Sequence, residues 1–206
     1  MKIGIINTFT SNIQSVFNAL DCLGYLEYEE ISSKNLNFDK NFSHIILPGN
    51  GSFKDNMNKI RESKLDKFIR KQFEEKKFFL GICVGMQILA TYGEENEIIE
   101  GLNIIPGTVK KIPVSKKKIP HIGWNEISFT KKDKLFKGIE NSENIFYFLH
   151  SYFFEPKNTS SVLCTTKYEV DFPVSIKINN FYGVQFHPEK SQAQGLKLIE
   201  NFLKLK

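Results

Sequence analysis

The feature that most restricts the fold is the alternation of short apolar runs with amphipathic segments in the first half of the chain. Apolar side chains recur at helical spacing from Ile13 to Leu23, and Gly24 ends this pattern. A second helical pattern lies within residues 52–76, and a third begins after Gly85. Such alternation is typical of a mainly parallel central sheet flanked by helices, so we predict an α/β fold. The strand-like runs are residues 2–6, 25–31, 44–47 and 78–82.

The second half of the chain changes to short β-like runs over residues 98–186, and an amphipathic segment over 192–205 predicts a final helix. The dipeptide Asn-Asn at 179–180 separates the last two runs, which is typical of a β-hairpin. No linker, repeat or low-complexity stretch divides the two halves. We therefore expect a single domain over residues 1–206 with an antiparallel β insertion in its C-terminal half. The runs are residues 104–112, 122–129, 145–154, 161–168, 173–178 and 181–186.

Composition argues against several classes of protein. Of the 206 residues, 41% are hydrophobic and 25% are charged, as in ordinary soluble domains. The net charge of +5 comes mainly from lysine runs within 110–118 and 131–137. Because these runs lack interleaved aromatic or arginine residues, we interpret them as solvated loops and expect no nucleic-acid partner. No apolar stretch is long enough for a membrane span, and the N-terminus does not resemble a signal peptide.

The three cysteines, Cys22, Cys83 and Cys164, are widely spaced and odd in number. This spacing fits neither a disulfide framework nor a zinc site, so we expect a reduced, cytoplasmic protein without a metal.

Cys83 stands at the turn between a predicted strand and a predicted helix. Residues 81–85, Gly-Ile-Cys-Val-Gly, have the form of a nucleophile elbow, where flanking glycines avoid clashes around a strained central residue. This position would expose the sulfur at the edge of the sheet, where the start of the helix favours a thiolate. The N–H of Val84 could then stabilise an oxyanion. The simpler interpretation is a buried structural cysteine.

A thiolate nucleophile needs a base, and His187 has the most suitable neighbours. It ends an apolar run and is followed by Pro188 and Glu189. Residues i and i+2 of an extended chain project to the same side, so Glu189 could accept a hydrogen bond from one imidazole nitrogen. The other nitrogen would remain to transfer a proton. The alternative is an exposed turn without a catalytic role. The other histidines, which show no metal-ligand spacing, are His44, His121 and His150.

The segments LPGNG at 47–51, GICVGMQ at 81–87 and FHPE at 186–189 resemble the class I, or triad, glutamine amidotransferases. The resemblance runs along nearly the whole chain. It implies a flavodoxin-like α/β fold and hydrolysis of glutamine to glutamate and ammonia through a cysteine thioester. It implies no cofactor.

Three further segments resemble one branch of this family, the glutaminase subunit of imidazole glycerol phosphate synthase. They are PHIGWN at 120–125, FYFLHSY at 146–152 and YGVQFHPEKS at 182–191. This branch delivers ammonia to a separate (β/α)₈ cyclase subunit, which makes imidazole glycerol phosphate and aminoimidazole carboxamide ribotide in histidine biosynthesis. The resemblance therefore implies a heterodimer.

The resemblance also implies roles for individual residues. Cys83 would be the nucleophile, His187 the general base and then acid, and Glu189 the residue that orients His187. The N–H groups of Val84 and of the turn at 48–51 would form the oxyanion hole. The remaining implied residues are Asn50 and Gly51 for the oxyanion hole, Gln87, Glu95, Ser151 and Tyr152 for substrate binding, and Asn12 and Trp124 for the partner interface.

Two positions depart from the family pattern. Asn50 stands where the family usually has valine, and asparagine tolerates left-handed backbone better than valine does. We therefore expect the amide at this position to flip more easily. The segment 7–16 lacks the glycine-rich form common in the family and keeps only Asn12 in register.

Three other functions remain open at this point. A paralogous glutaminase could supply ammonia to a sugar amidotransferase in surface-glycan synthesis. The chain could instead be a non-catalytic regulatory or binding subunit, or it could bind nucleic acid through its lysine runs. The presence of Cys83, His187 and Glu189 together favours an enzyme.

Overall fold

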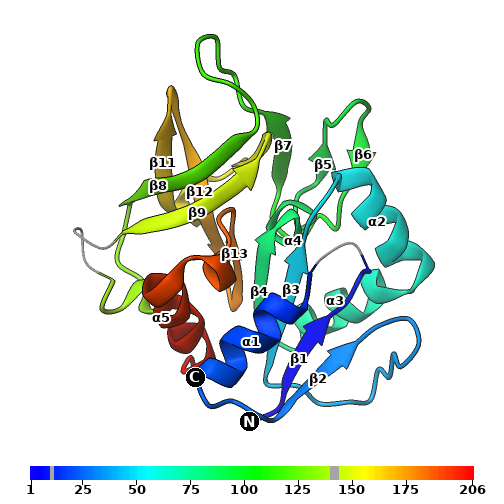
Figure 1. Ribbon diagram of the computed structural model, residues 1–206. Coiled ribbons are helices and arrows are strands. Elements are labelled where there is room, and N and C mark those ends of the chain that lie inside the picture. The colour runs from blue at the N-terminus through cyan, green and yellow to red at the C-terminus, as the bar shows by residue number, and fades with distance from the viewer. Residues whose placement is uncertain (10–11, 140–143) are drawn as a thin grey trace.

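A computed structural model describes residues 1–9, 12–139 and 144–206 (Figure 1). Five strands of its large sheet pair in parallel: four come from the first half of the chain, as the sequence predicts, and the fifth, β13 (Phe181–Val184), comes from the second half, which was expected to be antiparallel. Most of these strands are buried apolar runs, which is typical of strands covered on both faces. Their order across the sheet is β2 (Tyr28–Ile31), β1 (Ile3–Ile6), β3 (His44–Gly49), β4 (Phe78–Cys83) and β13 (Phe181–Val184).

The same sheet continues beyond β13 with antiparallel strands, so the described residues contain one sheet of nine strands. The turn at Asn179 and Asn180 joins β12 to β13 as the predicted hairpin. The antiparallel insertion is therefore continuous with the parallel sheet and extends it on one side. Its strands, in order from β13, are β12 (Val170–Ile178), β11 (Val162–Tyr168), β8 (His121–Phe129) and β9 (Ile145–His150).

A smaller sheet takes part of a run that the sequence predicts as one strand. Residues 145–154 form two strands that belong to different sheets, with the break at Ser151. The apolar pattern contains no signal for this break, because the separation depends on a distant partner: the N–H of Ile112 donates to the Ser151 carbonyl. The small sheet consists of β10 (Tyr152–Pro156), β7 (Gly107–Lys111), β5 (Tyr92–Gly93) and β6 (Ile99–Glu100).

Helices flank the large sheet (Figure 1). The pattern over residues 52–76 forms two helices and not one, because Lys64 adopts a left-handed backbone with φ of 59° and separates them. The first of the two begins at Ser52, whose side chain accepts from the N–H of Asp55. The long helices are α1 (Gln14–Cys22), α2 (Phe53–Glu62), α3 (Leu65–Glu74) and α5 (Gln192–Leu203), and the 3₁₀ turns are η1 (Lys134–Phe136), η2 (Thr159–Ser161) and η3 (Pro188–Lys190).

The helix predicted to begin after Gly85 differs from the structure in position and length. The helix α4 (Val84–Gln87) begins earlier and has only four residues. It stops because the carbonyls of Ile88, Leu89 and Ala90 accept hydrogen bonds from the backbone N–H groups of residues 102–105. Only a short helix therefore follows Cys83.

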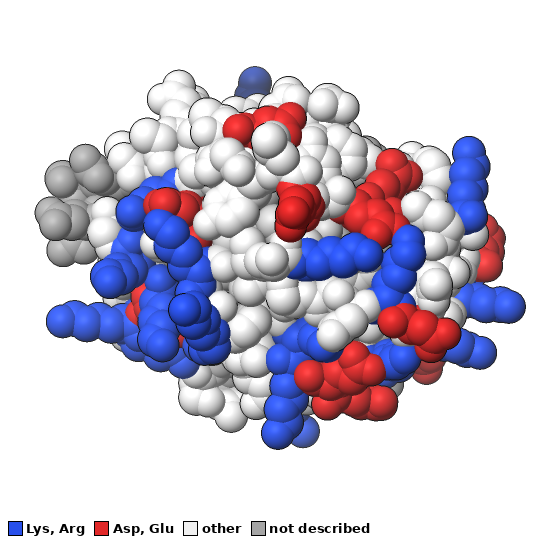
Figure 2. Space-filling model, turned by 90° about the horizontal axis from the view of Figure 1, so that it is seen from below, with Lys and Arg blue, Asp and Glu red and all other residues white. Residues whose placement is uncertain are grey.

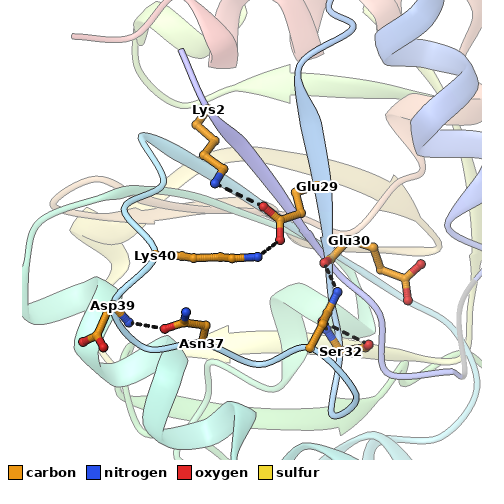
Figure 3. A network of polar contacts seen from close by, with 8 residues as sticks. Lys2, Glu29, Glu30, Ser32, Asn37, Asp39 and Lys40 are labelled. Atoms are coloured by element: carbon orange, nitrogen blue, oxygen red, sulfur yellow. Dashed lines mark hydrogen bonds and ion pairs between the residues drawn. The ribbon is translucent and has the colours of Figure 1, made fainter.

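Charged side chains surround the edge strand β2, where backbone groups could otherwise pair with another chain. Glu29 lies between two lysines, with Lys2 at 3.2 Å and a hydrogen bond from Lys40 (Figure 3). The hydrogen bond from Lys40 is the main cause that lowers the pKa of Glu29. Next to this group, the N–H of Ser32 donates to the side chain of Asn35.

On the face shown in Figure 2, basic and acidic side chains are interspersed. Among the helices of the described residues, none is long and apolar enough to cross a membrane.

Candidate active site

Cys83 occupies a strained turn at the end of β4. Its backbone has φ of 54° and ψ of −113°, a conformation that a residue with a side chain rarely adopts. The glycines on either side make the turn possible. A Cβ on Gly81 would lie 2.4 Å from the carbonyl oxygen of Gly85, and one on Gly85 would lie 2.1 Å from that of Leu47. The predicted elbow is therefore present. Because α4 is so short, its dipole contributes less at Cys83 than a long helix would.

The turn at 48–51 lies beside Cys83 because β3 and β4 are parallel neighbours. Gly49 pairs in register with Cys83, and Asn50, Gly51 and Val84 line the same cavity as Cys83. The left-handed conformation of this turn falls on Gly51, with φ of 79°, and not on Asn50. We expected an easily flipped amide because asparagine tolerates left-handed backbone. That reason does not apply to this conformation, in which Asn50 is not left-handed.

Two hydrogen bonds fix the peptide between Asn50 and Gly51. The N–H of Gly51 donates to the side-chain oxygen of Asn50 at 2.9 Å, and the side chain of the buried Asn56 donates to the Asn50 carbonyl at 2.8 Å. The Gly51 N–H can thus reach an oxyanion only after its bond to Asn50 opens.

His187 follows β13, the strand that pairs with β4, so the histidine and the cysteine stand at neighbouring strand ends. Its Nδ1 lies 2.8 Å from Glu189 Oε1, and both side chains are only 5% exposed. Burial lowers the pKa of His187, but the negative charge of Cys83 and the hydrogen bond to Glu189 outweigh it and raise the pKa above its ordinary value. These three residues therefore form one electrostatic unit.

The segment after His187 docks on the edge of β9. The N–H of His187 donates to the Tyr147 carbonyl at 2.9 Å, and the N–H of Tyr147 donates to the Ser191 hydroxyl at 3.0 Å. Ser191 in turn donates to the His187 carbonyl at 2.6 Å. The backbone position of the histidine thus depends on the antiparallel half of the sheet.

A cavity of about 180 Å³ opens on Cys83, and all four residues predicted to bind substrate line it. One carboxylate oxygen of Glu95 accepts from the N–H of Phe53 at 2.8 Å. Burial raises the pKa of Tyr152, and the negative charge of Glu95 raises it further by a smaller amount. The predicted lining residues are Gln87, Glu95, Ser151 and Tyr152, and three further lining residues were not predicted: Pro120, Leu149 and His150.

Another residue that the sequence analysis did not assign is Gln185. It is fully buried and its side chain contacts the Cys83 sulfur. The signal for it was available, because it stands two residues before His187 and so projects to the same side of the chain.

The predicted partner residues are exposed. Asn12 is exposed just after residues 10–11, so the segment 7–16 lies partly outside the described residues. Trp124 is 49% exposed on β8, and its ring lies 6.0 Å from that of Tyr147 on β9. Ile122 and Ile145 are also exposed on these strands. We call Ile122, Trp124, Ile145 and Tyr147 the β8–β9 patch.

A thiol at a strained elbow, beside a buried histidine–carboxylate pair, defines a cysteine-dependent class of acyl-transfer enzyme. The family model "Glutamine amidotransferase class-I" matches residues 4–205. The chain belongs to this family, the class I glutamine amidotransferases.

Relatives and solved structures agree with this family. Proteins named imidazole glycerol phosphate synthase subunit HisH from Moorella thermoacetica and Pelagibacter ubique are 40% and 41% identical to this chain. The first match covers 97% of this chain and 93% of the relative, and the second covers 100% of both. The structure of PurLQS from Thermotoga maritima has a TM-score of 0.74 at 18% identity, over 98% of this chain and 97% of that one. That likeness supports the fold alone.

Proposed function

We propose that this chain is the glutaminase subunit of an imidazole glycerol phosphate synthase. The observation that carries the proposal is that the Cys83 elbow and the His187–Glu189 pair stand at neighbouring strand ends, in a chain that matches relatives of that name over nearly its whole length. Glutamine is the substrate, and the chain supplies ammonia for histidine biosynthesis.

In the reaction, the Cys83 thiolate attacks the side-chain carbonyl carbon of glutamine, and a tetrahedral oxyanion forms. When the C–N bond breaks, His187 gives its proton to the departing nitrogen, so that ammonia leaves and a thioester remains. The neutral His187 then takes a proton from water as the water attacks the thioester. The C–S bond then breaks, the electron pair of that bond stays on the sulfur, and glutamate leaves.

The oxyanion needs donors that are already in place. Val84, the residue after the nucleophile, offers its backbone N–H, and the turn at Asn50 and Gly51 offers the second donor. Since Asn50 holds the N–H of Gly51 in the present conformation, the hole is only partly formed. A partner that opens this bond would raise the rate of hydrolysis.

The cavity suits an amino acid whose side chain reaches the sulfur. We assign Glu95 to the α-amino group, because a carboxylate pairs with an ammonium group. Gln87 uses its two N–H groups within the protein, so its carbonyl oxygen is the atom that it can offer to the substrate. Ser151 and Tyr152 line the cavity with them.

We assign the ammonia acceptor to a separate (β/α)₈ cyclase subunit, since the relatives are named as subunits. Its docking surface is the β8–β9 patch together with Asn12. Exposed aromatic and aliphatic side chains of this kind are typical of interface anchors. A cytoplasmic location fits the three cysteines, all of which are free.

The test is glutamate release from glutamine by the purified chain, alone and with the cyclase subunit plus its nucleotide substrate. We expect slow hydrolysis alone and strong stimulation in the complex. Hydrolysis that is not stimulated by the cyclase would indicate another ammonia acceptor, such as a sugar amidotransferase. No hydrolysis under either condition would favour a non-catalytic subunit.

A further inference from the structure

Gln185 lies between the two halves of the proposed catalytic machinery. It follows β13, its side chain is 0% exposed, and its backbone N–H donates to the Val174 carbonyl at 2.8 Å. Its side-chain Nε2 lies 3.6 Å from the Cys83 sulfur, within hydrogen-bonding distance for sulfur. Its Oε1 accepts from Gln87 Nε2 at 2.9 Å. Both ends of this buried amide are therefore engaged.

The orientation of the Gln185 amide follows from a backbone carbonyl. The backbone carbonyl of Tyr152 can only accept a hydrogen bond, and its oxygen lies 2.9 Å from Gln87 Nε2. If the Gln87 amide were turned over, two oxygens would face each other, so its nitrogen must point to Tyr152. The second N–H of that nitrogen then donates to Gln185 Oε1. Gln185 consequently presents an N–H group, and not an oxygen, to the sulfur of Cys83.

Two buried histidines support the same carbonyl. His150 Nδ1 lies 2.9 Å from the Tyr152 oxygen, so it carries a proton, and His150 Nε2 accepts from His121 Nδ1 at 3.0 Å. His121 Nε2 can then accept from the Asn125 amide at 3.2 Å. Burial lowers the pKa of His121 to about 4 and that of His150 to about 3, so both rings are neutral, as this arrangement requires. From Asn125 through the two histidines, each donor points toward Tyr152, and the Tyr152 carbonyl accepts from both His150 and Gln87.

We propose that Gln185 is a further catalytic residue, whose side-chain N–H stabilises the thiolate of Cys83, while Gln87 and the Tyr152 carbonyl hold the amide in the donating orientation. The inference rests on the proposed function in that it takes Cys83 as the nucleophile. The N–H acts twice in each turnover. It favours the anionic sulfur before attack on the amide carbon, and it favours the same anion when the C–S bond of the thioester breaks. The amide itself exchanges no proton.

The charged and titratable groups around the sulfur come from different elements. His187 and Glu189 approach from the end of β13, Glu95 and Tyr152 line the cavity, and the neutral His150 stands at the end of β9. Gln185 differs from all of these because it is an uncharged donor that contacts the sulfur directly. Its removal changes the surroundings of the thiolate without removing a charge.

The experiment measures the rate of alkylation by iodoacetamide as a function of pH, because only the thiolate reacts. A Cys22→Ser background removes the exposed thiol, and Cys164 is fully buried. In that background, Gln185→Met keeps the size of the side chain and removes the donor. We expect the midpoint of the curve to rise by about one pH unit and the rate at pH values below the midpoint to fall about tenfold, with the plateau at high pH unchanged. Mass spectrometry of the labelled peptide confirms that Cys83 is the modified residue.

The matched control is Gln72→Met. Gln72 is a buried glutamine on α3, and among the described residues its amide has no hydrogen-bond partner. This variant should leave the alkylation curve in place. If Gln185→Met does not fold, Gln185→Leu is used, because it also lacks the donor and adds no charge beside the sulfur.

An unchanged midpoint in a folded Gln185 variant would overturn the inference. Because alkylation needs no turnover, the result is independent of glutamine hydrolysis. A shifted midpoint in a chain without glutaminase activity would keep the inference and reject the proposed function. Normal glutaminase activity together with an unchanged midpoint in the variant would keep the proposed function and reject the inference.

Discussion

The imidazole Nδ1 of His187 lies 2.8 Å from Glu189 Oε1, in a pair whose side chains are almost completely buried. An ionised carboxylate cannot donate, so the proton of this contact belongs to the ring nitrogen that faces Glu189. In the proposed mechanism, the other nitrogen, Nε2, is then the one that exchanges protons with the reacting groups. Tyr147 fixes the histidine backbone and Glu189 fixes the ring, so two separate elements orient the base.

Replacing Glu189 with glutamine should both slow the reaction and change its pH dependence. Glu189 raises the pKa of His187, so its loss lowers that pKa and the imidazolium form disappears at a lower pH. We expect kcat to fall roughly 100-fold or more, and the alkaline limb of the kcat/KM profile to move to lower pH. Steady-state hydrolysis of glutamine across the neutral and alkaline range measures both.

The control for this variant is Glu74→Gln, at an exposed carboxylate on α3. It should behave like the unmodified chain. An alkaline limb that stays in place in Glu189→Gln would show that another group titrates there.

The residues of the proposed catalytic triad stand out in the sequence because their signals are local. Cys83 lies between glycines two residues away on either side, and His187 and Glu189 are separated by a single proline. The strand–helix alternation likewise gave the parallel half of the sheet, since buried runs such as Phe78–Cys83 have no polar interruption.

What the sequence did not predict depends on contacts between distant segments. The break at Ser151 is made by Ile112, and the early end of α4 is made by residues 102–105. The sequence shows only that Gln185 faces the same side of the chain as His187, and not which residues it contacts, because its partners Cys83 and Gln87 are about a hundred positions away. Periodicity reports which face of a segment is buried, and it does not report which segment covers that face.

Replacing Cys83 with alanine should separate the two activities of the complex. The variant has no nucleophile, so glutamine hydrolysis should fall to background. Synthesis in the complex with the cyclase should continue when ammonium salts are added, because the proposed function assigns the step that uses ammonia to the partner. Loss of the ammonium-dependent reaction as well would contradict this division of labour.

Replacing Asn50 with alanine should raise the basal rate of hydrolysis. The side-chain oxygen of Asn50 holds the N–H of Gly51, and alanine has no acceptor for it. With this N–H released, a second oxyanion donor becomes available without the partner. One such donor contributes on the order of 10²-fold or more to kcat, so a rise of several-fold is expected from partial release.

Asn50→Asp is the matched comparison, since it keeps an acceptor of the same length. It should retain a low basal rate. Equal rates for the alanine and aspartate variants would show that the Gly51 N–H does not limit hydrolysis. The ratio of rates with and without the cyclase should shrink in Asn50→Ala, because its basal rate is already higher.

Replacing Trp124 with alanine should weaken the complex without slowing the isolated chain. Trp124 is half exposed and packs edge-on against Tyr147 within the β8–β9 patch, which is the arrangement of an interface anchor. A central anchor contributes about 2 kcal/mol, so the Kd for the cyclase should rise roughly 30-fold. Leu26→Ala is the control, because Leu26 is 76% exposed and precedes β2 at the other edge of the sheet. Calorimetric titration with the cyclase measures both variants. A Kd that is unchanged in Trp124→Ala, or that rises equally in Leu26→Ala, would place the docking surface elsewhere.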